Sequence, residues 1–284
     1  MFKSHFRVFV SSWFLVRVFV SSWFLVLPAR AGATVFASAY VPAQTSGLVS
    51  PFDNPGAAVG GPNGLTGVGT KFLGVLSPFN PAYEPKDIVK IGPGGQLTLQ
   101  FPDFVRVGGG NEVGVVSNNF LVDASGSGAN TNPAQVFGSG VPGGGTAEVL
   151  VSDDGANWHS IGAHTFDEPA NYYQDAASPY QSTPGNNPAD FGVPFTHPIS
   201  DLNGLDWPHT LALFGSSGGG TWLDLGASGL SQIDYIQFRA PSGGGALVID
   251  AVSVNNSDVG APVPEPMGVG AILLSVAALW RRRR

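Results

Sequence analysis

The sequence QLTLQF at residues 96–101 decides the fold class that we predict for this chain. Its apolar side chains, two leucines and a phenylalanine, alternate with polar ones. Successive side chains of a β-strand point to opposite faces, so this order gives one apolar face and one polar face. We therefore predict a strand that covers a hydrophobic core with one face and meets solvent with the other.

Similar short apolar runs lie on both sides of this strand and are separated by turn-forming residues. GPGG at residues 92–95 predicts a turn, DDGAN at residues 153–157 predicts a hairpin turn, and residues 166–210 read as a long polar loop region. The other predicted strands lie at residues 88–91, 112–116, 120–123, 147–152, 158–161, 211–214, 221–225, 233–239 and 246–254. This set predicts an all-β, jelly-roll-like β-sandwich with long Gly/Pro loops and no amphipathic helix in the body.

The composition agrees with this fold class. The chain of 284 residues contains 40 glycines, 23 prolines and only 12% charged residues, which is typical of a loop-rich secreted β protein. It has no cysteine, and this excludes disulfide bonds and thiolate metal sites. The domain must therefore be held together by its core, with or without a metal bound through oxygen ligands.

Acidic residues dominate the central part of the chain. Residues 32–262 hold 19 acidic and five basic residues, whereas eight of the 13 basic residues lie in the terminal segments. A surface of this charge repels nucleic acid and anionic lipid, and it favours divalent cations or neutral partners. We therefore expect no nucleic-acid partner.

Residues 1–31 predict a secretory signal peptide. Basic residues precede an apolar segment, and the small residues of Ala-Arg-Ala, ending at Ala31, are typical of a cleavage site. The decapeptide RVFVSSWFLV occurs twice in succession within residues 7–26, so the apolar segment of the signal is duplicated. Cleavage after Ala33 or Ala39 is the alternative, and the predicted β-sandwich domain spans residues 32–262.

Residues 263–284 form a tail of three parts. The parts are Pro264, Glu265 and Pro266, then residues 267–280 without a charge, and then Arg281, Arg282, Arg283 and Arg284. Fourteen helical residues rise about 21 Å, which is short for a hydrocarbon core of about 30 Å. Because arginines are retained on the cytoplasmic side, we predict a short transmembrane helix whose arginine run lies in the cytoplasm.

This order of parts resembles the PEP-CTERM sorting signal of exported bacterial proteins. The resemblance implies Sec export, a transient intermediate tethered to the inner membrane, and recognition of the tail by an exosortase, with its removal near Pro-Glu-Pro. It further implies a Gram-negative bacterium that makes extracellular polysaccharide. The final location would be the cell surface or the extracellular matrix.

The body carries a second set of ordered patterns across residues 88–254. These include GGQLTLQF at residues 94–101, DFGVPF at residues 190–195 and IDAVSV at residues 249–254. The set is similar to exported bacterial β-sandwich proteins that resemble galactose-binding-like jelly rolls. The chain departs from that group at residues 117–118, which are Ser-Asn where an acidic residue followed by Asn is expected.

Three acidic residues, Glu112, Asp123 and Asp250, fall in or beside predicted strands. An unpaired charge is costly to bury, and carboxylates are the hard oxygen ligands that calcium prefers. Calcium is therefore a candidate cofactor with these residues as ligands. Carboxylates that are hydrogen-bonded or exposed to solvent are the alternative.

Aromatic residues in predicted loops, Tyr172, Tyr173 and Trp207, are candidate glycan contacts because sugar rings stack on exposed aromatic faces. Burial is the alternative. The sequence GSSGG at residues 215–219 fits Gly-x-Ser-x-Gly, but a strand rather than a helix is predicted after it, which favours a loop over a nucleophile.

No catalytic residues stand out, so we expect a non-enzymatic exported protein with a structural or adhesive role. A carbohydrate-binding module for extracellular polysaccharide is the first alternative, and a secreted hydrolase is the second.

Overall fold

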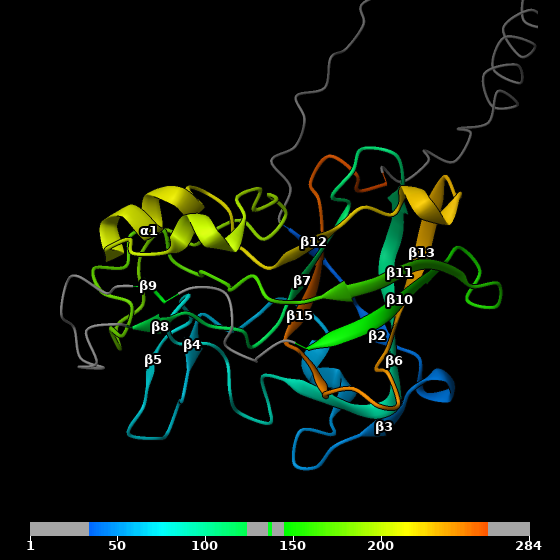
Figure 1. The fold of residues 1–284 in the computed structure, drawn as a ribbon, viewed down its shortest axis with the longest axis horizontal. Helices are drawn as coiled ribbons and strands as arrows, with labels where there is room; N and C mark the ends of the chain where they lie inside the picture. The colour runs from blue at the N-terminus through cyan, green and yellow to red at the C-terminus, as the bar shows by residue number, and fades with distance from the viewer. Residues whose placement is uncertain (1–33, 124–135, 138–144, 261–284) are drawn as a thin grey trace, which may run out of the picture. The chain divides into compact units, whose positions relative to one another are not determined.

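The computed structural model describes residues 34–123, 136–137 and 145–260, and antiparallel sheets dominate them (Figure 1). The strands are β1 (Val35–Phe36), β2 (Ala39–Tyr40), β3 (Ser46–Leu48), β4 (Leu65–Thr66), β5 (Gly74–Val75), β6 (Val89–Arg106), β7 (Val113–Val116), β8 (Val122–Asp123), β9 (Val136–Phe137), β10 (Thr146–Ser152), β11 (His159–Thr165), β12 (Thr221–Leu223), β13 (Gln232–Arg239), β14 (Leu247–Ile249) and β15 (Ala251–Val254). The helical segments are α1 (Trp207–Phe214) and the 3-10 helices η1 (Pro42–Gln44), η2 (Pro55–Ala58), η3 (Ile199–Leu202) and η4 (Gly226–Ser228). The all-β prediction is confirmed.

Two sheets contain most of the strands. The smaller has the order β1-β15-β7-β12, and the larger has the order β11-β10-β13-β6-β14, with β2 and β3 also paired to β6. The hairpin predicted around residues 153–157 is confirmed, because β10 and β11 pair antiparallel on either side of it. The pairs β4–β5 and β8–β9 form separate two-stranded sheets.

The strand predicted at residues 96–101 is the middle of β6, which has 18 residues and pairs with β2, β3, β13 and β14. The turn predicted at residues 92–95 is wrong, because the backbone stays in the sheet there. Gly94 has a φ of +75°, and a Cβ on Gly47 of β3 would lie 2.5 Å from the Cα of Gly95. These glycines therefore allow the strand to bend where a side chain would collide with its neighbour.

The segment at residues 246–254, predicted as one strand, forms two strands in different sheets. β14 pairs with the start of β6 in the larger sheet, whereas β15 pairs with β7 in the smaller one. Asp250 is the single residue between them. The chain therefore crosses from one sheet to the other at Asp250.

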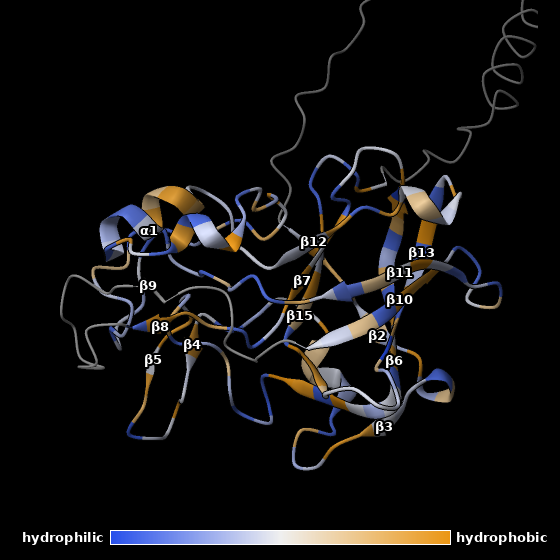
Figure 2. Cartoon of the chain, viewed as in Figure 1, coloured by the Kyte–Doolittle hydropathy of each residue, from blue (hydrophilic) through white to orange (hydrophobic). Residues whose placement is uncertain are grey.

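The two sheets enclose one hydrophobic core. Its fully buried side chains include Leu97, Leu99 and Ile236 of the larger sheet and Val113 and Val252 of the smaller sheet. Two sheets that share a core in this way form a β-sandwich. Figure 2 shows the apolar residues along β7 and β15. All residues of these two strands are buried, which explains why VGVV and AVSV do not alternate.

The outer face of the smaller sheet is covered by a second apolar layer. Val116 of β7 and Ala251 of β15 pack there against Ala170 and Phe191. Ala170 and Phe191 belong to residues 166–210, predicted to be a polar loop region, and that prediction missed these buried side chains.

Helix α1 is a correction to the sequence analysis, which predicted a strand at residues 211–214 and no helix. Asp206 caps its N-terminus by accepting a hydrogen bond from the backbone N–H of His209 at 3.0 Å, and Gly215 follows its last turn. Trp207 is only 2% exposed, and its indole N–H donates to the carbonyl of Ala176 at 2.7 Å. In the described ranges no helix is long and apolar enough to cross a membrane.

Replacing Trp207 with Ala should destabilise the domain, because the change removes a buried indole and leaves the Ala176 carbonyl without its donor. We expect a loss of about 3–5 kcal/mol in the free energy of unfolding, measured by urea denaturation. Phe72→Ala is the matched control, since Phe72 is 64% exposed, and it should change stability by no more than about 0.5 kcal/mol. Equal effects of the two changes would contradict the buried position of Trp207.

Candidate functional site

Two buried carboxylates, Asp87 and Asp250, lie near enough for the charge of Asp87 to raise the pKa of Asp250. Asp87 ends a turn in which its N–H donates to the carbonyl of Glu84 at 2.9 Å, just before β6. Asp250 is fixed at the sheet crossing, where its N–H donates to the carbonyl of Val116 at 2.8 Å. The residues are 2% and 3% exposed, respectively. The fold itself thus carries two acidic side chains into the interior.

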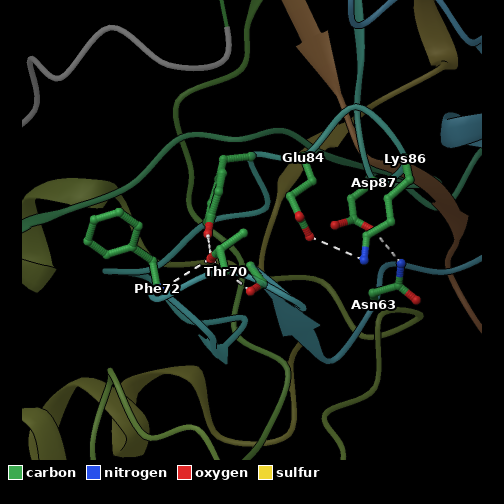
Figure 3. Close-up of polar contacts among 8 residues, drawn as sticks. Asn63, Thr70, Phe72, Glu84, Lys86 and Asp87 are labelled. Atoms are coloured by element: carbon green, nitrogen blue, oxygen red, sulfur yellow. Dashed lines mark hydrogen bonds and ion pairs between the residues drawn. The ribbon is translucent and has the colours of Figure 1, made fainter.

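The polar contacts of Asp87 are visible in Figure 3, where the side-chain amide of Asn63 donates to its Oδ1 at 2.6 Å. Oδ2 of Asp87 and Oδ2 of Asp250 are both buried without a hydrogen-bond partner. Burial, and then the charge of Asp87, raise the pKa of Asp250 well above its ordinary value of 3.8. The ion pair of nearby Lys86 is with Glu84, at 3.2 Å.

A pair of buried carboxylates requires a proton or a cation, because two like charges in a poorly solvated site repel each other. Calcium takes six to eight oxygen ligands, including carboxylates, amide carbonyls and water. The two Oδ2 atoms are oxygen ligands of this kind, and both are buried without a hydrogen-bond partner. Among the described residues, Oδ1 of Asn118 is also buried without a hydrogen-bond partner.

Glu112 is fully buried, but backbone amides satisfy its charge. Its Oε1 accepts hydrogen bonds from Gly108 and Gly110 at 2.8 and 2.9 Å, and its Oε2 accepts one from Leu225 at 2.9 Å. Burial raises the pKa of Glu112, but these bonds, led by that from Leu225, outweigh it and leave the pKa lowered. The structure therefore favours the hydrogen-bonded alternative for this residue.

Asp123 has different neighbours again. It ends β8, and the hydroxyl of Tyr180 donates to its Oδ2 at 3.4 Å. Across the described residues, no three His, Asp or Glu side chains converge on a common point. The structure thus does not assemble Glu112, Asp123 and Asp250 into one site. It pairs Asp250 with Asp87, a residue that the sequence analysis missed.

The three aromatic candidates have different environments. Tyr172 is half-buried and lines a hollow of about 200 Å³ together with Phe36, Pro62 and Phe191. Tyr173 is 9% exposed and its ring lies 4.8 Å from that of Tyr172, measured between centroids. Trp207 is the first residue of α1 and is buried, so its prediction as an exposed glycan contact is wrong.

Ser217, the serine of the Gly-x-Ser-x-Gly pattern, stabilises its loop through hydrogen bonds. It is 3% exposed, its hydroxyl donates to the carbonyl of Val193 at 2.7 Å, and the same oxygen accepts from the N–H of Gly219. The strand β12 follows, as the sequence predicted.

The sorting residues of the tail, Pro264, Glu265, Pro266 and Arg281 to Arg284, lie outside the described residues, as does the signal segment. The described part defines the chain as an antiparallel β-sandwich with a buried carboxylate pair. No protein-family model matches the chain, and no curated protein matches it either. The function is therefore inferred from the residues of the chain itself.

Calcium should stabilise the protein at pH 7 if Asp87 and Asp250 hold it. An ion at 100 times its Kd adds about 2.7 kcal/mol, which corresponds to a rise in Tm of roughly 5–10 °C for a domain of this size. We expect this rise in a thermal melt when calcium replaces chelator. Asp250→Asn should abolish the response, whereas Asp53→Asn, an exposed control, should retain it. An unchanged Tm of the wild-type chain would contradict a cation at this pair.

The Asp250→Asn variant also allows a test of pH dependence, carried out with chelator present so that no calcium is bound. Because the folded pKa of Asp250 is raised, its contribution to stability is fully present below about pH 3.8 and is lost as the pH rises through the raised pKa. The free energy of unfolding of the wild-type chain should therefore fall relative to that of Asp250→Asn as the pH increases, as followed by urea denaturation. A constant difference would contradict the buried position of this carboxylate.

Proposed function

We propose that this chain is an exported protein of the bacterial cell surface or extracellular matrix. In this proposal residues 32–262 form a structural or adhesive β-sandwich without a catalytic role. The observation that carries the proposal is the tail, in which Pro-Glu-Pro, an uncharged span and four arginines occur in order. Residues 1–31 support it, since export and sorting require a signal. An exosortase in the membrane would be the partner that processes the tail.

In the described body, carboxylates accept hydrogen bonds from backbone N–H groups of loops, and this supports a structural role. Asp154 accepts hydrogen bonds from the backbone N–H groups of Ala156 and Asn157, both at 2.8 Å. Asp175 accepts from those of Asn186 and Asn187 at 2.8 and 3.0 Å. Such bonds stabilise long loops in a chain that has no disulfide. We extend the proposal to a jelly-roll relationship, which the antiparallel two-sheet arrangement supports.

A calcium ion at Asp87 and Asp250 is part of this proposal. Extracellular modules bind calcium with dissociation constants of about 10⁻⁴–10⁻³ M, a range matched to the environment outside the cell. An exported sandwich with a weak cation site would therefore reach full stability after export.

Replacing Pro264, Glu265 and Pro266 together with Ala should block sorting. In a host with an exosortase, we expect wild-type protein at the cell surface or in the matrix, without the tail by mass spectrometry. The triple variant should keep its tail and remain with the inner membrane. Pro262→Ala, just outside the motif, is the control and should be processed normally. Intact wild-type chain in the cytoplasm, with both ends attached, would contradict the proposal.

A carbohydrate-binding role is the second candidate function, and the hollow beside Tyr172 favours it. The ring of Phe191 lies 5.8 Å from that of Tyr172 and 6.2 Å from that of Phe36, measured between centroids. Aromatic walls are typical of sites that stack against sugar rings. A volume of about 200 Å³ suits one ring rather than a larger ligand.

Tyr172→Ala should weaken binding to the producer's extracellular polysaccharide in affinity electrophoresis. Loss of one stacking ring is expected to cost about 1–3 kcal/mol, by analogy with base stacking. Tyr40→Ala removes a 38% exposed tyrosine elsewhere and should leave retardation unchanged. Equal mobility of the wild-type chain with and without polysaccharide would exclude this second function.

A further inference from the structure

The tip of the β4–β5 hairpin, residues 67–73, concentrates exposed apolar side chains. Val68 is 50% exposed, Phe72 is 64% exposed and Leu73 is 37% exposed. They are three of the five large apolar side chains that are exposed among the described residues. Single exposed apolar residues are ordinary, but such a concentration on one short segment is typical of an interaction site.

The hairpin tip is ordered by Thr70, so the exposure is built into the structure. The hydroxyl of Thr70 donates to the carbonyl of Gly67 at 2.9 Å and accepts from the N–H of Phe72 at 3.0 Å. It also lies 3.1 Å from the hydroxyl of Tyr83, a residue outside the hairpin. Thr70 and Phe72 are labelled in Figure 3. These bonds order the backbone of the tip at Phe72, whose side chain is exposed.

The charge of the hairpin tip differs from that of the rest of the body. Lys71 is the only charged residue in residues 61–83, although the body as a whole is strongly acidic. Its ammonium group lies 4.9 Å from the centroid of the Phe72 ring. Apolar and aromatic side chains beside a single lysine are the usual anchors at a membrane interface, where the amine meets phosphates and the apolar groups enter the acyl boundary.

We infer that the hairpin tip inserts into a lipid surface of zwitterionic headgroups. The shape favours lipid over a flat protein surface, because the β4–β5 loop extends away from both sheets (Figure 1), and lipid can close around a projecting apolar tip. The charge favours zwitterionic headgroups, because the phosphate pairs with Lys71 while the acidic body avoids a strongly anionic surface. The tip thereby orients the sandwich against a membrane independently of the tail.

The absence of cysteine allows a test at single positions. An environment-sensitive fluorophore is attached to the full-length chain at Phe72→Cys or, as the control, at Ser242→Cys, an exposed position in the β13–β14 loop. Each labelled chain is mixed with phosphatidylcholine vesicles, with and without a quencher in the acyl region. Thermal melts check that both variants remain folded.

With the label at position 72, emission should rise, shift to the blue and be quenched from the acyl region. The label at Ser242→Cys should show none of these changes, even where the tail binds the vesicle. Combining Phe72→Cys with Val68→Ser and Leu73→Ser should reduce the shift. The same response at both positions, or no response at position 72 when the chain sediments with vesicles, would overturn the inference. A blue shift that depends on protein concentration without lipid would also overturn it, in favour of a second copy of the chain.

Discussion

The crossing of the chain from one sheet to the other at Asp250 is the constraint on which the described structure depends. β14 and β15 are neighbours in sequence but close the same core from opposite sheets. The chain has no cysteine, so no disulfide supports this crossing, and the two sheets pack against each other around the shared core. The residue at the crossing is excluded from solvent by the geometry, and it is a carboxylate. The fold therefore places an ionisable group in the interior, beside the second buried carboxylate of Asp87, where its charged form needs compensation.

The need to compensate these two buried carboxylates links the fold to the proposed location outside the cell. A carboxylate pair that remains protonated needs no ion, but protonation becomes costly as the pH rises. A divalent cation removes this cost and is abundant outside the cell, where weak sites suffice. Glu112 shows the other solution, since three backbone amides satisfy its charge without an ion. In the proposed exported protein, one buried acid fixes a loop, and the pair of Asp87 and Asp250 would bind a cation.

The fold class could be predicted from the sequence because a fold class depends on local patterns of apolar and polar residues. The alternation at residues 96–101 identified the core-facing side of β6, and Leu97 and Leu99 are fully buried. Features set by tertiary contacts were missed. The break at Asp250 depends on two sheets competing for adjacent residues. Asp87 is paired with Asp250 only in space, so no spacing rule could reveal it. Helix α1 was missed although Asp206 before it and Gly215 after it are ordinary capping signals, because eight residues give little periodicity.

The most direct test of the carboxylate pair is a crystal structure of the chain grown in calcium. If the two charges are compensated by an ion, density should lie between Oδ2 of Asp87 and Oδ2 of Asp250, with oxygen ligands at about 2.3–2.6 Å. Two carboxyl groups in direct hydrogen-bonding contact, with no ion between them at saturating calcium and neutral pH, would contradict this view of the fold.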